Sequence, residues 1–243
     1  MRRMVGSALL ASTRPSRGFL ANAAAAVESF FLEPAVPLPA PDAAEPGERR
    51  LGVWVFGLAC GCGATVVARA LATELAVRDP GGTAAVQCEA RPGGIPLATH
   101  AATRLARVLE DLPRADPRAV GRLCLAGGAD TLRLASAARH HAPLVIDAGS
   151  DALGGAPASL ADRTVIVTTQ AVEPALVRVA ADCIARVARV PIVVLNRAPH
   201  DQPGLFALPN SPLGARLALG GREARGELGR AIAELADLLE EEP

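Results

Sequence analysis

Short apolar runs alternate with longer segments of helical spacing along most of this chain, and this alternation restricts the fold more than any other feature. Runs of this length that are apolar on both faces are typical of buried strands in a parallel sheet. We expect strands at residues 52–56, 84–88, 122–126, 144–147, 164–168 and 192–196, with a weaker strand at 205–208. The pattern predicts an α/β fold, a doubly wound and mostly parallel sheet of about seven strands with helices on both faces.

Two of the intervening segments carry an apolar stripe of helical spacing. Residues three or four apart lie on the same face of a helix, so each stripe predicts a helix that buries one face against the sheet. The first stripe follows the first expected strand and the second lies near the C-terminus; they consist of Val67, Ala70, Leu71 and Leu75, and of Leu228, Ile232, Leu235 and Leu239.

Two segments without this alternation precede the expected domain, which spans residues 50–240. Residues 1–32 carry four arginines before the first acidic residue, Glu28, and hold three of the five phenylalanines. Three interpretations stay open: a helix docked on its own domain, a contact with a protein partner or a membrane surface, and a targeting segment. Residues 33–49 carry five prolines, which predicts an extended, semi-rigid spacer.

Composition narrows the classes of partner and location. The chain has 25 basic and 25 acidic residues, so its charge gives no specific signal for nucleic-acid binding. All 25 basic residues are arginines, and no mechanism of this chain can therefore use a lysine ammonium. The five cysteines do not form the framework of a secreted disulfide protein, and no uninterrupted apolar run could span a bilayer. We expect a cytoplasmic protein.

A small-residue loop, LACGCGAT, follows the first expected strand at residues 58–65 and leads into the first expected helix. Loops of this kind point backbone N–H groups into an anion-sized hollow at the N-terminus of a helix. Against the P-loop pattern GxxxxGK[ST], Gly63 takes the second glycine and Thr65 the hydroxyl, but Ala64 stands at the lysine. The sequence predicts a phosphate-binding loop that lacks its cation.

The loop resembles the deviant P-loop of the MinD/ParA family of partitioning ATPases, whose pattern is GKGGxGK[ST][ST]. Gly61 and Gly63 match its last two glycines, and Thr65 matches its first hydroxyl. The departures from the family's pattern are Ala59 and Ala64 at the two lysines, Cys60 at a glycine and Val66 at the last hydroxyl. The resemblance implies the fold of a P-loop nucleoside triphosphatase.

Further segments resemble the family's motifs in the same order along residues 50–240. They are LCLAGGAD at 123–130, LVIDAG at 144–149, TVIVTTQAVEPALVR at 164–178, IVVLNR at 192–197 and LPNSPLGARLALG at 208–220. In the last of them Asn210 stands where the family usually has an acid.

This resemblance implies ATP and Mg²⁺ as cofactors. Asp147 and Thr65 are the metal ligands that it implies, and Asn196 is the adenine contact. Asp147 and Glu89, the acid nearest the end of the second strand, are the candidate catalytic residues. The implied nucleotide-binding residues are Gly61, Cys62, Gly63, Ala64, Thr65, Val66, Asn196, Arg197 and Pro209.

Absence of the lysine bears directly on activity. Phosphoryl transfer depends on cations that stabilise charge in the transition state, and loss of one such donor raises the barrier by about 3 kcal/mol. Arg91 and Arg197 follow expected strands on the ligand side, and either could supply charge from there.

Two functions follow from the resemblance. The first is a bacterial nucleotide-binding protein with weak ATPase activity, a homodimer that acts as a switch in positioning, secretion or pilus assembly. The alternative is a pseudo-ATPase that serves as a regulatory or partner-binding module and uses residues 1–32 to reach a protein or the membrane periphery. A thiol or metal sensor built on Cys60, Cys62 and Cys88 is less favoured, because a C-x-C pair lacks the spacing of a structural zinc site.

Overall fold

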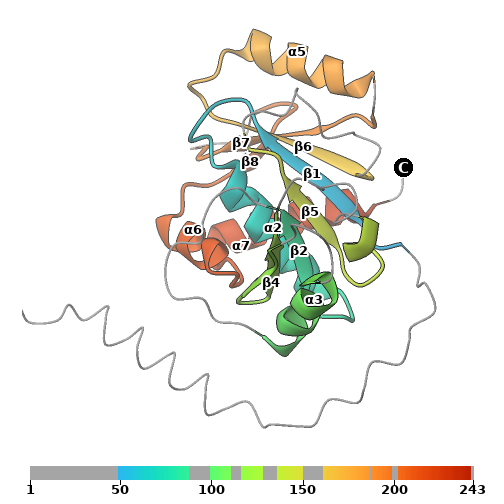
Figure 1. The fold of residues 1–243 in the computed structure, drawn as a ribbon. Coiled ribbons are helices and arrows are strands. Elements are labelled where there is room, and N and C mark those ends of the chain that lie inside the picture. Colours follow the sequence, from blue (N-terminus) through green and yellow to red (C-terminus); the bar gives the residue numbers. More distant parts are fainter. Residues whose placement is uncertain are drawn as a thin grey trace, which may run out of the picture. The chain divides into compact units, whose positions relative to one another are not determined.

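The computed structural model describes residues 49–87, 99–110, 116–127, 136–149, 161–186, 188–198 and 202–241. The expectations for residues 1–32 and for nearly all of the spacer 33–49 lie outside these ranges, as do those for Cys88, Glu89 and Arg91. The described residues form an eight-stranded sheet with helices on both faces (Figure 1).

The sheet contains every strand that the sequence predicts, and one more. Its strands are β1 (Gly52–Gly57), β2 (Ala84–Gln87), β3 (Arg118–Val120), β4 (Leu123–Ala126), β5 (Leu144–Asp147), β6 (Arg163–Thr168), β7 (Ile192–Asn196) and β8 (Phe206–Leu208). They lie in the order β3-β4-β2-β5-β1-β6-β7-β8, and every neighbouring pair is parallel except β3 and β4. The doubly wound, mostly parallel α/β fold is confirmed.

The additional strand, β3, forms an antiparallel hairpin with β4 at one edge of the sheet. Gly121 makes the turn with a φ of 56°, which favours glycine. Of the three residues of β3 only Val120 is buried, whereas Arg118 is exposed. So short an edge strand has no apolar run, which is why the sequence pattern did not predict it.

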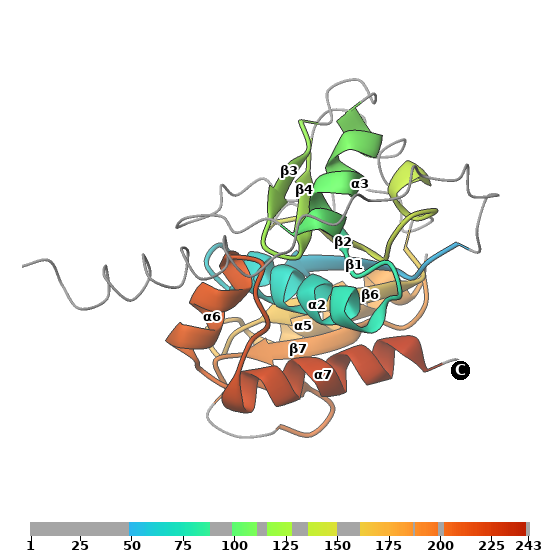
Figure 2. The ribbon, with the colours of Figure 1, turned by 90° about the horizontal axis from the view of Figure 1, so that it is seen from below.

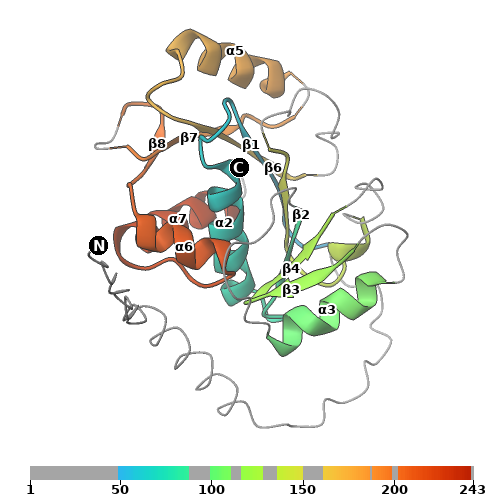
Figure 3. The same ribbon diagram turned by 60° about the vertical axis from the view of Figure 1, so that its left-hand side comes forward.

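Helices cover both faces of the sheet. They include α2 (Ala64–Arg78), α3 (His100–Glu110), α5 (Pro174–Ala185), α6 (Pro212–Leu219) and α7 (Gly226–Glu240). α6 and α7 pack beside α2 on one face (Figure 2), and α3 lies on the other side of the sheet (Figure 3). In the described part of the chain no helix is both long and apolar enough to cross a membrane.

β1 shows why both faces of the sheet need a cover. Val53 and Val55 are fully buried in the core formed with α2, α6 and α7. The alternate residues Trp54 and Phe56 point to the opposite face, into the core formed with α3 and α5. Because successive side chains of a strand point to opposite faces, a strand that is apolar throughout must lie between two layers of helices.

α2 and α7 bury the two helical stripes that the sequence predicts. The four residues of the α2 stripe are at most 2% exposed, and those of the α7 stripe are at most 4% exposed. Arg78, at the end of α2, holds the two helices together because one of its terminal nitrogens donates to Asp237 at 2.6 Å and to Glu240 at 2.9 Å. The direction of α2, and hence of its N-terminus, is fixed by this packing.

Leu235→Ala is expected to destabilise the fold, because Leu235 is fully buried in the core around α2 and its truncation leaves a cavity. We expect the free energy of unfolding to fall by about 2–5 kcal/mol. Leu238→Ala in the same helix is the control, since Leu238 is 44% exposed, and it should change that free energy by about 0.5–1 kcal/mol. Urea denaturation measures both, and equal losses would contradict the packing described for α7.

Candidate functional site

The loop between β1 and α2 has the strand–loop–helix arrangement that the sequence predicts. β1 ends at Gly57 and α2 begins at Ala64, with Gly63 as its N-cap. Gly61 and Gly63 have φ values of 74° and 93°, a left-handed backbone that residues with a Cβ adopt only with strain. These two glycines therefore determine how the chain turns from the strand into the helix.

Asn196 holds this loop in place from the end of β7. Its side-chain nitrogen, Nδ2, donates to the carbonyl oxygen of Cys62 at 2.8 Å in a buried hydrogen bond. The side chain of Cys62 turns into the core against Gly57, where a Cβ would lie 2.2 Å from the sulfur. A Cβ on Gly63 would lie 2.2 Å from Asn196 Nδ2. Gly57 and Gly63 are thus required for close packing, and Gly63 for its backbone angle as well.

A cavity of about 390 Å³ lies at the N-terminus of α2. Residues 59–65 line it together with Gly149 and Arg197. The unpaired N–H groups at the start of a helix carry about half a positive charge, so the hollow favours an anion. The predicted binding residues Gly61, Cys62, Gly63, Ala64 and Thr65 all line this cavity.

A second cavity of about 300 Å³ lies between α2, α7 and the segment that links β8 to α6. It contains the remaining predicted binding residues, Val66, Asn196, Arg197 and Pro209. Arg197 is the one residue of the described chain that lines both cavities. The two hollows are therefore adjacent, and Arg197 lies at their junction.

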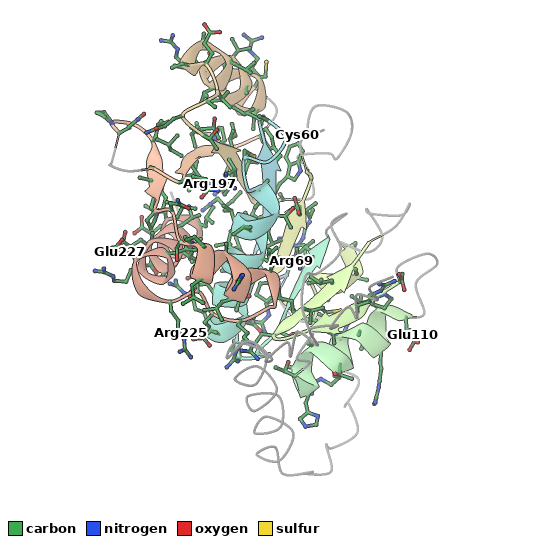
Figure 4. The ribbon with its side chains drawn as sticks, turned by 90° about the vertical axis from the view of Figure 1, so that its left-hand side faces the viewer. Cys60, Arg69, Glu110, Arg197, Arg225 and Glu227 are labelled. Atoms are coloured by element: carbon green, nitrogen blue, oxygen red, sulfur yellow. The ribbon has the colours of Figure 1, made fainter. Side chains whose placement is uncertain are left out.

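Arg197 stands on a left-handed backbone, with a φ of 58°. Its N–H donates to the side-chain oxygen of Asn196 at 3.0 Å, and the N–H of the next residue, Ala198, donates to the carbonyl of Leu208 at 2.9 Å. These bonds fix the turn that follows β7 on both sides. Arg197 and Cys60 lie toward the same end of the described domain (Figure 4).

Arg69, on the first turns of α2, has a structural role instead. Its side chain is fully buried, and one terminal nitrogen donates to the carbonyl of Leu219 at 2.7 Å, at the end of α6. Arg69 is not among the residues that line either cavity. It is therefore not placed to replace the cation missing at Ala64.

Thr65 and Asp147 are the residues that the sequence assigns to Mg²⁺. Thr65 lines the first cavity. Asp147 is the last residue of β5 and is 4% exposed. It accepts a hydrogen bond at 3.0 Å from the N–H of Gly149. Gly149 lines the first cavity, but Asp147 is not among its lining residues. One hydroxyl and one carboxylate fit the donor set of Mg²⁺, whose other ligands are water and phosphate oxygens.

The thiols of the loop do not share one environment. Cys60 is exposed and Cys62 is buried. Within the ranges that the structure describes, no group of three His, Cys, Asp or Glu side chains could hold a metal ion. Cys88, the third member of the suggested thiol cluster, lies outside these ranges.

Several cavity residues were not among the predicted site residues. Gly149 had a signal, because it lies two residues after Asp147 in the LVIDAG motif. For Leu228 and Ile232, the sequence contains no indication of a contact with a ligand, because their helical stripe predicts only core packing. They line the second cavity because the fold brings α7 there.

A glycine loop between a central parallel strand and the buried helix that follows it is the arrangement of a P-loop in an α/β domain. No family model matches this chain, and no curated protein sequence matches it. Among solved structures, a ParA-family ATPase from Chlorobium tepidum TLS matches with a TM-score of 0.51 at 15% identity, over 77% of this chain and 98% of its own. A structure described as a plasmid partition protein from Borrelia burgdorferi B31, bound to AMPPNP, matches with a TM-score of 0.50 at 11% identity, over 79% and 99%. The chain has the MinD/ParA-like P-loop fold that its motifs predict.

Gly63→Ala is expected to destabilise the protein more than Gly61→Ala. Both substitutions put a Cβ on a left-handed backbone, at a cost of about 1–2 kcal/mol each. At Gly63 the new Cβ also collides with Asn196 Nδ2, whereas at Gly61 nothing lies within 4 Å. We expect urea denaturation to show an additional loss of about 1 kcal/mol or more at Gly63, from the strained Asn196–Cys62 hydrogen bond.

A double-mutant cycle tests the cause of that difference. Asn196→Ala removes the group that the new Cβ meets, so Gly63→Ala should be less destabilising in this background than in the wild type. Strictly additive free energies would show that the two residues do not interact.

Proposed function

We propose that this chain is a divergent MinD/ParA-like nucleotide-binding protein that holds the phosphates of ATP, with Mg²⁺, in the loop between β1 and α2. The observation that carries the proposal is the cavity at the N-terminus of α2, lined by the loop itself. Two left-handed glycines keep side chains out of the loop's turns, and backbone N–H groups remain for an anion.

Electrostatics support the binding of an anion. No acidic side chain is among the described residues that line either cavity, and Arg197 contributes a positive charge to both. The second cavity mixes apolar side chains of α2 and α7 with the polar groups of Asn196, Asn210 and Ser211, as expected for a nucleobase and sugar. A protein of the same fold has been solved with AMPPNP, which adds support for a nucleotide as the ligand.

Binding and hydrolysis place different demands on this site. Mg²⁺, when bound, supplies charge to the phosphates, and Thr65 and Asp147 are the residues that would hold it. The loop's own cation is missing, because Ala64 begins α2 where the family has its lysine and the whole chain has no lysine. The barrier to phosphoryl transfer therefore rises by about 3 kcal/mol, and we propose at most weak ATPase activity.

The proposed biological role depends on whether the chain hydrolyses ATP or only binds it. With weak hydrolysis, the chain acts as a cytoplasmic nucleotide switch in positioning, secretion or pilus assembly, as a homodimer. Without it, the chain is a pseudo-ATPase that regulates or binds a partner, with residues 1–32 as the contact to a protein or to the membrane periphery. The absence of any lysine favours the second role, and the release of phosphate by purified protein separates the two.

Titration with labelled ATP tests the binding proposal. Wild-type protein should bind ATP saturably and more tightly with Mg²⁺ than without it. Thr65→Ala should weaken binding roughly tenfold in Mg²⁺, because a ligand of the metal is lost, and should have little effect in EDTA. Thr103→Ala is the control, since it removes a hydroxyl from α3, outside both cavities. A wild-type chain that binds no ATP would refute the proposed function.

The rate at which Cys60 is alkylated provides a second test of whether a nucleotide binds in the first cavity. Cys60 and Cys183 are exposed, whereas Cys62 is buried and burial raises the pKa of the Cys124 thiol to about 12. At pH 8 Cys124 is therefore protonated and unreactive, since the thiolate is the nucleophile. Mg²⁺-ATP at ten times its dissociation constant should slow iodoacetamide labelling of Cys60 roughly tenfold, because a bound ligand fills the cavity that Cys60 lines.

Cys183 is the internal reference for this experiment. It lies on α5, outside both cavities, and its labelling rate by peptide mass spectrometry should not change with nucleotide. Equal protection of Cys60 and Cys183 would indicate a general change of the protein and would not support a ligand in the loop.

A further inference from the structure

We infer that Arg197 supplies the cation that the loop lacks, and that it binds the α- and β-phosphates of a nucleotide, the phosphates nearest the sugar. This inference rests on the proposed function, because it names a residue and a ligand specificity for the same site. It predicts a site that binds nucleoside di- and triphosphates alike.

The place of Arg197 between the two cavities carries the argument. A nucleotide that extends through both hollows has its base in the second cavity and its terminal phosphates in the loop. The sugar and the first phosphates then lie at the junction, where Arg197 lines both cavities. A P-loop lysine, by contrast, belongs to the loop itself and reaches the β- and γ-phosphates.

The charge of Arg197 is available for a ligand. In the described ranges no carboxylate forms an ion pair with Arg197. Arg197 is exposed, and the lining residues that the structure describes include no acid to neutralise it. A guanidinium presents several N–H donors in a plane, a geometry that suits phosphate oxygens.

The backbone of Arg197 is arranged to present this side chain. An arginine at a φ of 58° is strained, and such conformations persist only where the surroundings impose them. Here the bonds of Arg197 and Ala198 to Asn196 and Leu208 hold the turn. Since Asn196 also bonds to Cys62, Arg197 and the loop are fixed to the same side chain.

Specificity is the measurable consequence. A cation over the α- and β-phosphates contacts groups that ADP and ATP both carry, so it does not favour the triphosphate. AMP offers one phosphate instead of two or three and should bind less tightly. Adenosine carries no phosphate, so its affinity should not depend on Arg197 at all.

The experiment measures dissociation constants for ATP, ADP, AMP and adenosine by isothermal titration calorimetry on the full chain in Mg²⁺. The variants are Arg197→Ala, Arg197→Gly and Arg197→Asn. Glycine and asparagine tolerate a left-handed backbone, so these two variants retain the fold even if alanine does not. The control is Arg225→Ala, which removes an exposed arginine at the N-cap of α7, outside both cavities (Figure 4).

We expect wild-type affinities for ATP and ADP to agree within about threefold. Each Arg197 variant should weaken both roughly tenfold or more, as expected for the loss of a charge-assisted hydrogen bond. Adenosine binding should stay within about twofold of the wild type, and Arg225→Ala should bind all four ligands as the wild type does.

Failure of this inference can be told from failure of the proposed function. Arg197→Gly and Arg197→Asn variants that bind ATP and ADP as the wild type does would overturn the role of Arg197 and leave nucleotide binding intact. A wild-type preference for ATP over ADP of more than about tenfold would overturn the placement over the α- and β-phosphates. A wild-type chain that binds none of the four ligands would overturn both proposals.

Discussion

The hydrogen bond from Asn196 Nδ2 to the carbonyl of Cys62 holds the candidate site together. It is buried and joins residues 134 positions apart, the end of β7 and the loop after β1, although β6 separates these strands in the sheet. Cys62 lines the first cavity and Asn196 the second. Loss of the bond would leave a buried carbonyl and amide unpaired, at about 1–3 kcal/mol, and would release the loop from the strand that positions Arg197.

Because all 25 basic residues of this chain are arginines, any lysine-like charge at the candidate site has to be a guanidinium. Several of its arginines are committed to the fold: Arg69 caps the end of α6, and Arg139 is 2% exposed and pairs with Asp162. Burial lowers the pKa of Arg139, while the nearby Asp162 carboxylate opposes that effect. Among the described arginines, Arg197 alone lines the two cavities, so it is the one placed to contribute a positive charge there.

Sequence predicted the layers of this fold well, because buried strands and helical stripes are local patterns. It also predicted the loop, because Gly61 and Gly63 belong to a known sequence motif and their left-handed backbone requires glycine. It did not predict the partners of Asn196 within the chain, whose amide bonds to the carbonyl of Cys62 and to the N–H of Arg197. Side-chain partners between distant strands depend on the strand order, which no single segment encodes.

The shared anchor is consistent with the proposal that this chain binds a nucleotide and hydrolyses it weakly or not at all. Asn196 holds the loop through its nitrogen and the turn of Arg197 through its oxygen, so both parts of the site share one anchor. A preformed site loses little entropy of ordering when it binds a ligand. Hydrolysis, however, requires interactions that strengthen as charge develops on the terminal phosphate. In the proposed placement, Arg197 reaches the α- and β-phosphates and not the γ-phosphate, so it adds affinity but does not replace the contact of a P-loop lysine with the transferred group.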